Sequence, residues 1–302
     1  MNTSSPEAQA IFTAHQAALA LPVTSTAAPV FSSTDPIYRA AKQACLALGF
    51  IAIDAECLGL AWQAMTRRTG RFDPAAWPDE PADFGMQPWP RAHAFATCPK
   101  ALGLYAVLPD AAWVGRMARA GVPTVQLRFK SDDVHAVERE VKAAVAAVRD
   151  TDALLFINDH WRAAIDAGAY GVHLGQEDMD VANLAAIRAA GLRLGLSSHG
   201  YAEMLRADAS SPSYIAMGAV FPTTLKRMAT APQGPGRLHA YARLMRNYPL
   251  VAIGGIDGDK MAQVLNSGVG SVAVVRAITA AAHPEEAAAQ LMAQLGPKNI
   301  CF

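Results

Sequence analysis

The sequence lacks an excess of charge of either sign, and charged residues are few. Lys plus Arg and Asp plus Glu each number 26 in 302 residues, and the four types together make up 17% of the chain. A protein without a net field has no general attraction for nucleic acid or for an anionic membrane. We therefore expect small-molecule ligands held by local clusters of charge, and no nucleic-acid or membrane partner.

Cysteine and long apolar runs are also scarce. The four cysteines are scattered without a C-x-x-C pair, which predicts free thiols in a reducing compartment. The first 36 residues contain no Lys or Arg, which argues against a secretory signal. The longest apolar run, residues 44–53, is too short to span a bilayer. These absences predict a cytoplasmic protein, and they leave a homo-oligomer open.

Glycine is scarce only in the first hundred residues, which hold four of the 22 glycines but ten of the 19 prolines. This split predicts an N-terminal extension over 1–100 and a second domain over 101–297. Within the extension we expect a partly disordered stretch with one short helix over 1–36 and two helices over 37–70. Six prolines in 71–100 leave little room for regular structure and predict a linker.

From residue 102 onward, short aliphatic or β-branched runs alternate with amphipathic, Ala-rich stretches. One such stretch carries valine at helical spacing, at positions 134, 137, 141, 145 and 148. The eight runs lie at 103–108, 123–128, 153–158, 170–175, 193–197, 213–221, 249–255 and 271–275. Strands that alternate with helices predict a parallel sheet, and eight such units predict a TIM (β/α)8 barrel. A doubly wound open sheet is the alternative.

In a TIM barrel the active site lies at the carboxyl ends of the strands. The second run ends in Gln126-Leu127-Arg128-Phe129-Lys130. Strand alternation places Gln126, Arg128 and Lys130 on one face. One amide and two cations suit a ligand with several negative oxygens. A surface rim of salt bridges would explain this segment equally well.

Two carboxylates follow the next two runs. Asp159 comes after Asn158 at the end of the third run, and Asp178 follows the fourth. Neighbouring strands lie about 4.8 Å apart, so the two carboxylates would face each other across the rim. A loop hydrogen bond for Asp159 and a helix N-cap for Asp178 are the alternatives. Beside Arg128 and Lys130, however, the pair indicates a Mg²⁺ site that also engages a phosphate-type ligand.

Hydroxyls follow the fifth and sixth runs. Ser197 belongs to a Ser-Ser-His segment without a G-x-S-x-G elbow, so we expect it to bind a ligand rather than attack one. Thr223 and Thr224 lie at the end of the sixth run, together with Lys226. These groups add one more cation to the same rim.

The last two runs end in features typical of a phosphate site. Gly254-Gly255 follows the seventh run, and Val275-Arg276 follows the eighth. Glycine turns with free backbone amides bind phosphate at this place in many TIM barrels. A Mg²⁺ site, a cationic cluster and a separate monophosphate site together predict a diphosphate ester that reacts with a phosphorylated partner as pyrophosphate leaves.

Eight blocks of the sequence carry a resemblance to a known family, in its order and spacing: GLYAVL, GVPTVQLRFK, LLFINDHW, AYGVHLGQEDMD, AGLRLGLSSH, PSYIAMGAVFPTTLK, APQG and VAIGGI. Over roughly 102–295 the chain resembles thiamine-phosphate synthase (thiamine-phosphate pyrophosphorylase), a TIM-barrel family. That family joins 4-amino-2-methyl-5-diphosphooxymethylpyrimidine to 4-methyl-5-(2-phosphooxyethyl)thiazole, giving thiamine phosphate and pyrophosphate.

The resemblance implies a role for each matching residue. It implies Mg²⁺ as cofactor, held by Asp159 and Asp178. The contacts it implies to the pyrimidine diphosphate are Gln126, Arg128, Lys130, Asn158, Ser197 and Lys226. We expect Arg128, Lys130, Ser197 and Lys226 to be catalytic. The contacts it implies around the thiazole phosphate are Thr223, Thr224, Gly255 and Val275.

Three positions depart from the family pattern. Phe129 replaces a residue that is usually Ile or Glu, and we expect no consequence for the chemistry. The predicted substrate-binding segment includes both Leu127 and Phe129. Leu225 stands where many members have a second Thr, which removes a hydroxyl from the thiazole side. Arg276 stands where Ser usually follows Val275, and we expect its guanidinium to strengthen phosphate binding.

The extension has no counterpart in the ordinary family. Residues 37–70 faintly resemble the closing helices of hydroxymethylpyrimidine-phosphate kinases, but the glycine-rich anion-binding turn is missing, so we expect packing on the barrel rather than kinase activity. Two other functions compete with the synthase. A thiazole tautomerase on the same barrel would make His199 catalytic and need neither the metal pair nor the cations, and a phosphate-ligand sensor would be non-catalytic.

Overall fold

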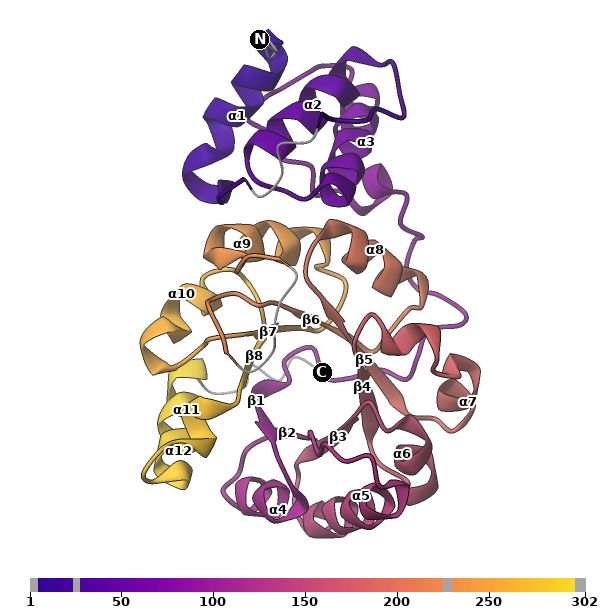
Figure 1. Ribbon diagram of the computed structural model, residues 1–302, viewed down its shortest axis with the longest axis vertical. Coiled ribbons are helices and arrows are strands. Elements are labelled where there is room, and N and C mark those ends of the chain that lie inside the picture. Colours follow the sequence, from indigo (N-terminus) through magenta and orange to yellow (C-terminus); the bar gives the residue numbers. More distant parts are fainter. Residues whose placement is uncertain (1–4, 24–27, 225–229, 297–302) are drawn as a thin grey trace.

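Eight short parallel strands pair in chain order, and the last pairs with the first, so the sheet closes into a barrel (Figure 1). The computed structural model describes residues 5–23, 28–224 and 230–296. The strands are β1 (Gly103–Leu108), β2 (Thr124–Leu127), β3 (Leu154–Asn158), β4 (Gly171–Leu174), β5 (Arg193–Ser198), β6 (Tyr214–Met217), β7 (Leu250–Ile253) and β8 (Ser271–Val274). The predicted TIM barrel is confirmed, and the open sheet is excluded.

Helices surround the ring of strands (Figure 1). They are α4 (Ala111–Arg119), α5 (Val134–Val148), α6 (Trp161–Ala167), α7 (Leu184–Ala189), α8 (Tyr201–Ala209), α9 (Gly234–Leu244), α10 (Met261–Leu265), α11 (Arg276–Thr279) and α12 (Pro284–Leu295), with short 3₁₀ turns η2 (Asp178–Asp180) and η3 (Gly258–Lys260). Outward-facing aliphatic side chains of the strands and apolar helix faces form the large core. In α5 the first valine of the predicted apolar stripe does not belong to the buried face. Val134, directly after the N-cap Asp133, is 66% exposed.

The inside of the barrel is a second, smaller core built around aromatic rings. Tyr105, Phe156 and Tyr214 are buried there, with ring centroids 5.1 to 5.9 Å apart. The ring of Tyr214 fits only because β5 has a glycine opposite it. A Cβ on Gly195 would lie 2.1 Å from Cζ of Tyr214. These rings fill the centre of the barrel below the carboxyl ends of the strands.

The N-terminal extension begins with three helices, α1 (Pro6–Leu19), α2 (Pro36–Ala47) and α3 (Ala52–Thr69). Side-chain caps start the first two, from Ser5 and Asp35. The three helices share a small core of their own, which includes Trp62. α3 packs on α8 and α1 on α9, so the extension lies along one side of the barrel (Figure 1).

Residues 71–100, which we call the strap, contain little regular structure beyond η1 (Pro81–Phe84), as their prolines predict. The strap is nevertheless fixed to the barrel rather than a free linker. Arg91 donates to both carboxylate oxygens of Asp208 in α8, at 2.8 and 2.9 Å, and both side chains are buried. Prolines exclude regular hydrogen bonding, but they do not prevent side chains from packing.

Two smaller expectations concern the chain as a whole. No helix within the described parts of the chain combines the length and hydropathy needed to cross a membrane. The described cysteines, Cys45, Cys57 and Cys98, are free thiols, and Cys301 lies outside the described residues.

The strap contact predicts a specific loss of stability. Arg91→Ala leaves the buried Asp208 carboxylate without its cation, which should lower the free energy of unfolding by about 3–5 kcal/mol in a urea titration. Arg116→Ala is the matched control, because the ion pair between Arg116 and Glu285 is exposed and should contribute at most about 1 kcal/mol. Equal losses in the two variants would contradict the role given to Arg91.

Candidate functional site

A cavity of about 810 Å³ opens at the carboxyl ends of the strands, and all eight strands contribute to its wall. Most residues predicted from the sequence meet there. Those that line the cavity are Gln126, Arg128, Lys130, Asn158, Asp159, Asp178, Ser197, Thr223, Gly255, Val275 and Arg276. Closure of the sheet brings these side chains together from segments that are far apart in the chain.

Some members of the predicted substrate-binding segment do not reach the cavity. Leu127 is buried in the outer core, and Phe129 packs against that core. Their side chains leave the strand on the face opposite Gln126 and Arg128, as strand alternation requires, so these two side chains do not line the cavity, and their place in the substrate-binding segment stays a prediction. Thr224 is exposed and does not line the cavity. Leu225 and Lys226 lie outside the described residues.

The floor of the cavity is a chain of hydrogen bonds between buried side chains. The Tyr105 hydroxyl donates to Oε1 of Gln126 at 2.8 Å, and Nε2 of Gln126 donates to Oδ1 of Asn158 at 2.9 Å. The hydroxyls of Tyr105 and Tyr214 are 2.7 Å apart. A phenol has one proton. Since Tyr105 gives its proton to Gln126, Tyr214 is the donor in the contact between the two hydroxyls.

The same proton count fixes the other end of this chain. Nδ1 of His173 lies 2.7 Å from the Tyr214 hydroxyl, and Nε2 lies 2.8 Å from Oγ of Ser197. The proton of Tyr214 is already used, so Nδ1 of His173 carries a hydrogen and donates. In a neutral ring Nε2 then accepts from Ser197. Every donor therefore points the same way, from Ser197 towards Asn158.

This direction determines what the two ends offer a ligand. Oγ of Ser197 uses its proton on His173, so its lone pairs remain free to accept a hydrogen bond. Oδ1 of Asn158 accepts from Gln126, so the amide N–H groups of Asn158 remain to donate. The sequence did not reveal Tyr105 or Tyr214 as part of the site. Their only signal was an inward position on β1 and β6, which a core residue would share.

Asp159 and Asp178 face each other at the ends of β3 and β4. Asp159 adopts left-handed backbone geometry, with φ of 62°. Burial raises the pKa of Asp159 to about 6, and the charge and hydrogen bond of Asp178 add to the rise, against His160 and Arg128. Asp178 accepts from the backbone N–H of Gly175 at 2.9 Å and does not cap a helix. The predicted juxtaposition of the two carboxylates is present.

This donor set fits a hard divalent cation. Two facing carboxylates in a partly buried cavity repel each other, and the charge of Asp178 adds to the rise that burial causes in the pKa of Asp159, so a bound divalent cation would relieve that repulsion. Within the described residues no group of three His, Cys, Asp or Glu side chains could hold a metal. Mg²⁺ commonly takes one or two carboxylates and completes its shell with water and phosphate oxygens.

Unpaired cations lie in the same cavity. Arg128, Lys130 and Arg276 line it, and none of them forms an ion pair with another described residue. The described residues therefore do not form the surface rim of salt bridges that was the alternative explanation for this segment. Gly254 and Gly255, with φ of 104° and 66°, make the turn after β7, close to the start of α11 at Arg276. The cavity thus carries two separate sets of features for anions, one after β2 and one after β7 and β8.

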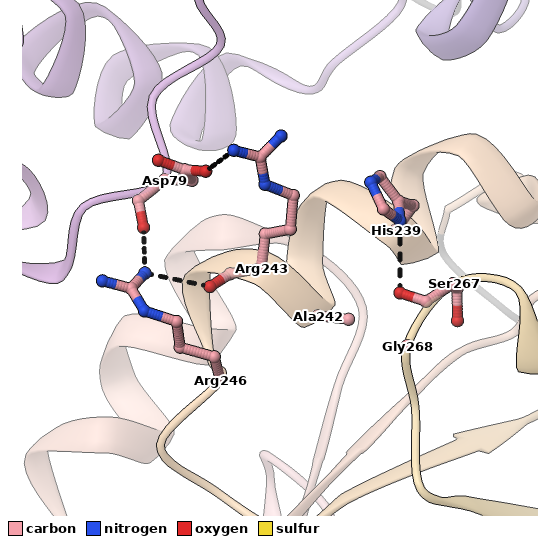
Figure 2. A pocket seen from close by; sticks show the side chains of 7 residues that line it. All are labelled: Asp79, His239, Ala242, Arg243, Arg246, Ser267 and Gly268. Carbon is pink, nitrogen blue, oxygen red and sulfur yellow. Dashed lines mark hydrogen bonds and ion pairs between the residues drawn. The ribbon is translucent and has the colours of Figure 1, made fainter.

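A second hollow, of about 510 Å³, lies between the strap and α9, and Figure 2 shows that its cations are already engaged. Arg243 pairs with Asp79. Arg246 donates to the backbone oxygen of Asp79 at 2.6 Å and pairs with Glu80 at 2.8 Å. These contacts make this hollow a docking seam of the strap rather than an anion site.

A TIM barrel whose cavity at the carboxyl ends of the strands gathers facing carboxylates, unpaired cations and a glycine turn is typical of an enzyme. The family model described as thiamine monophosphate synthase matches residues 104–278. The chain belongs to this family. It is therefore a transferase of thiamine biosynthesis.

Individual relatives agree with the family model. The chain is 59% identical over 184 residues to a thiamine-phosphate synthase of Neisseria meningitidis serogroup B, covering 61% of this chain and 90% of that protein. It is 54% identical over 202 residues to one of Salmonella agona, covering 67% and 96%. Among solved structures, thiamine phosphate pyrophosphorylase from Pyrococcus furiosus is 29% identical with a TM-score of 0.58, covering 65% of this chain and 96% of that one.

The hydrogen-bond chain on the cavity floor predicts the effect of one missing oxygen. Tyr214→Phe keeps the ring packing but removes the link between Tyr105 and His173, so the orientation of Ser197 is no longer fixed. We expect kcat/KM to fall roughly 10- to 100-fold, and the loss of the acceptor for the buried Nδ1–H of His173 should lower the free energy of unfolding by about 1–3 kcal/mol. Tyr170→Phe, at the opposite end of the barrel, is the control and should keep wild-type kinetics. Unchanged kinetics in Tyr214→Phe would show that the link is not needed.

Proposed function

We propose that the barrel joins 4-amino-2-methyl-5-diphosphooxymethylpyrimidine to 4-methyl-5-(2-phosphooxyethyl)thiazole by dissociative loss of pyrophosphate. The observation that supports this most strongly is the pair of facing carboxylates, Asp159 and Asp178, beside the unpaired Arg128 and Lys130. The negative charge of a diphosphate would be balanced partly by a metal ion that the two carboxylates hold and partly by the side chains of Arg128 and Lys130. The family of the chain performs this synthesis.

The cavity floor suits the pyrimidine ring. An aminopyrimidine carries a donor on its amino group and acceptors on its ring nitrogens. Ser197 offers an acceptor and Asn158 offers donors, at opposite ends of the hydrogen-bond chain. Gln126 lies between the two, with its amide held by Tyr105 and Asn158. The floor would therefore hold the ring in one orientation, with its diphosphate towards Arg128 and Lys130.

Asp159 and Asp178 would hold Mg²⁺, which when bound neutralises diphosphate charge and stabilises pyrophosphate as it leaves. Arg128 and Lys130 bind the diphosphate oxygens, whose charge grows as the C–O bond breaks, so these contacts strengthen in the transition state. Lys226, outside the described residues, is expected to act with them. The electron-rich aminopyrimidine stabilises the resulting carbocation, and the thiazole nitrogen captures it. Positioning rather than a strong base carries this reaction.

The thiazole phosphate would bind on the other side of the cavity. The turn at Gly254-Gly255 presents backbone amides, and Thr223 and Val275 line the wall beside it. Arg276, the first residue of α11, would add a cation to this subsite. Each phosphorylated substrate thus has its own anion-binding features, and the two reacting centres meet between them.

The competing functions have less support. A tautomerase would use His199 as an acid–base group and would need neither the carboxylate pair nor the free cations. Nδ1 of His199 is bonded to Glu203 at 2.6 Å. The sensor hypothesis rests on Arg276 and on Leu225, which lies outside the described residues. A pyrophosphate-release assay with both substrates separates the synthase from the other two functions, since only the synthase releases pyrophosphate.

The carboxylate pair gives the sharpest test by mutation. Asp159→Asn and Asp178→Asn should each lower the rate of pyrophosphate release at least about 100-fold and raise the Mg²⁺ concentration needed for half-maximal rate. Asp180→Asn is the control, because Asp180 lies in the same 3₁₀ turn but is exposed and paired with Arg206. Turnover that does not depend on added metal, or equal losses in all three variants, would contradict the proposed site.

A further inference from the structure

Helix α8 starts shortly after β5 ends, at the rim of the active-site cavity. Ser197 and Ser198 end β5, and both line the cavity together with His199. The N-cap of α8 is Gly200, which has no side chain to accept from the first turn of the helix. The first N–H groups of a helix need such an acceptor. The acceptor for this helix comes from another part of the chain.

Asp54, in the first turn of α3 in the extension, supplies it. Its side chain is buried, with 4% of the residue exposed, and Oδ1 accepts from the backbone N–H of Ala202 at 2.9 Å. The site is built for this carboxylate, because a Cβ on Gly200 would lie 2.1 Å from Oδ2 of Asp54. A capping residue at position 200 would therefore collide with Asp54. The extension thus provides the cap that α8 lacks.

The carboxylate is costly to bury. Burial raises the pKa of Asp54 to about 6, and the charge of Glu203 adds to the rise, whereas Arg237 and the N–H groups of α8 oppose it. Because the folded chain holds the proton of Asp54 more tightly than the unfolded chain does, the stability of the folded state falls as the pH rises through the pKa of about 6. Packing alone would not favour a carboxylate at this buried position. We therefore attribute the presence of Asp54 to its hydrogen bond with the first turn of α8.

The first turn of α8 connects this contact to the cavity. Glu203 accepts from the backbone N–H of His199 at 2.8 Å and contacts its Nδ1 at 2.6 Å, which ties the end of the β5 loop to the helix. Tyr201 is buried, accepts from Nε1 of Trp77 in the strap at 2.8 Å and stacks on Phe84. The extension and the strap therefore both contact the first turn of α8.

We propose that Asp54 is a positioning residue of the active site, which caps α8 across the interface and so fixes the end of β5 that carries Ser197. The assignment of Ser197 to the pyrimidine rests on the proposed function. The family model matches residues 104–278 and the Neisseria and Salmonella relatives align over only 61% and 67% of this chain, so Asp54 lies outside the family match. The cap is a contribution of the extension.

The test compares Asp54→Ala, Asp54→Asn and Asp79→Ala in the full-length chain. Asp54→Ala should raise KM for the pyrimidine diphosphate roughly 10- to 100-fold and leave KM for the thiazole phosphate unchanged. Asp54→Asn keeps one acceptor oxygen and should restore part of the affinity. Asp79→Ala removes a strap contact with Arg243 in α9, leaves the cap from Asp54 in place, and should keep wild-type kinetics (Figure 2).

Hydrogen exchange and thermal melting separate positioning from simple docking. Asp54→Ala should lose amide protection at 199–203 while its melting temperature at neutral pH stays equal to that of the wild type or rises. Wild-type kinetics in Asp54→Ala, or a parallel loss of stability and of both affinities, would overturn the proposal. If Asp54→Ala does not fold, wild-type kinetics in a folded Asp54→Asn with reduced protection at 199–203 would overturn it. Failure of the wild-type chain to release pyrophosphate would instead refute the proposed function.

Discussion

The parallel pairing of β8 with β1 is the constraint on which the rest of the structure depends. Because it closes the sheet, the carboxyl ends of all eight strands meet around one cavity. Asp159 and Asp178, which follow neighbouring strands, then face each other, and Arg128 and Lys130 lie beside them on the same rim. An open sheet of the same strands would leave the glycine turn after β7 far from the carboxylates after β3 and β4.

Closure also creates an interior that must be filled, and aromatic side chains fill it. Their hydroxyls are too deep to reach water, so they bond to each other and to polar groups at the rim. The result is a chain in which every proton points one way, from Ser197 towards Asn158. Burial thus gives the cavity floor a defined pattern of donors and acceptors, and the extension adds a second constraint on the same floor through α8.

Periodicity in the sequence predicted the barrel and much of its rim, whereas contacts between distant side chains left no local signal. Strand alternation correctly separated Gln126, Arg128 and Lys130 from Leu127 and Phe129, which reach the outer core instead. The sequence around a tyrosine in a strand does not show whether its hydroxyl bonds to another tyrosine, so the hydrogen bond between Tyr105 and Tyr214 could not be predicted. Likewise, prolines predicted an irregular strap but not its buried ion pair with α8, and nothing local marks Asp54 as a cap for a residue 148 positions away.

The two carboxylates and the free cations together form, in our proposal, a binding site for pyrophosphate with Mg²⁺. Isothermal titration of the full-length chain with inorganic pyrophosphate, with and without Mg²⁺, tests this central claim most directly, since neither organic substrate nor turnover is needed. We expect binding at micromolar concentration when Mg²⁺ is present and binding at least about tenfold weaker when it is removed. Equal affinity under both conditions would contradict the claim.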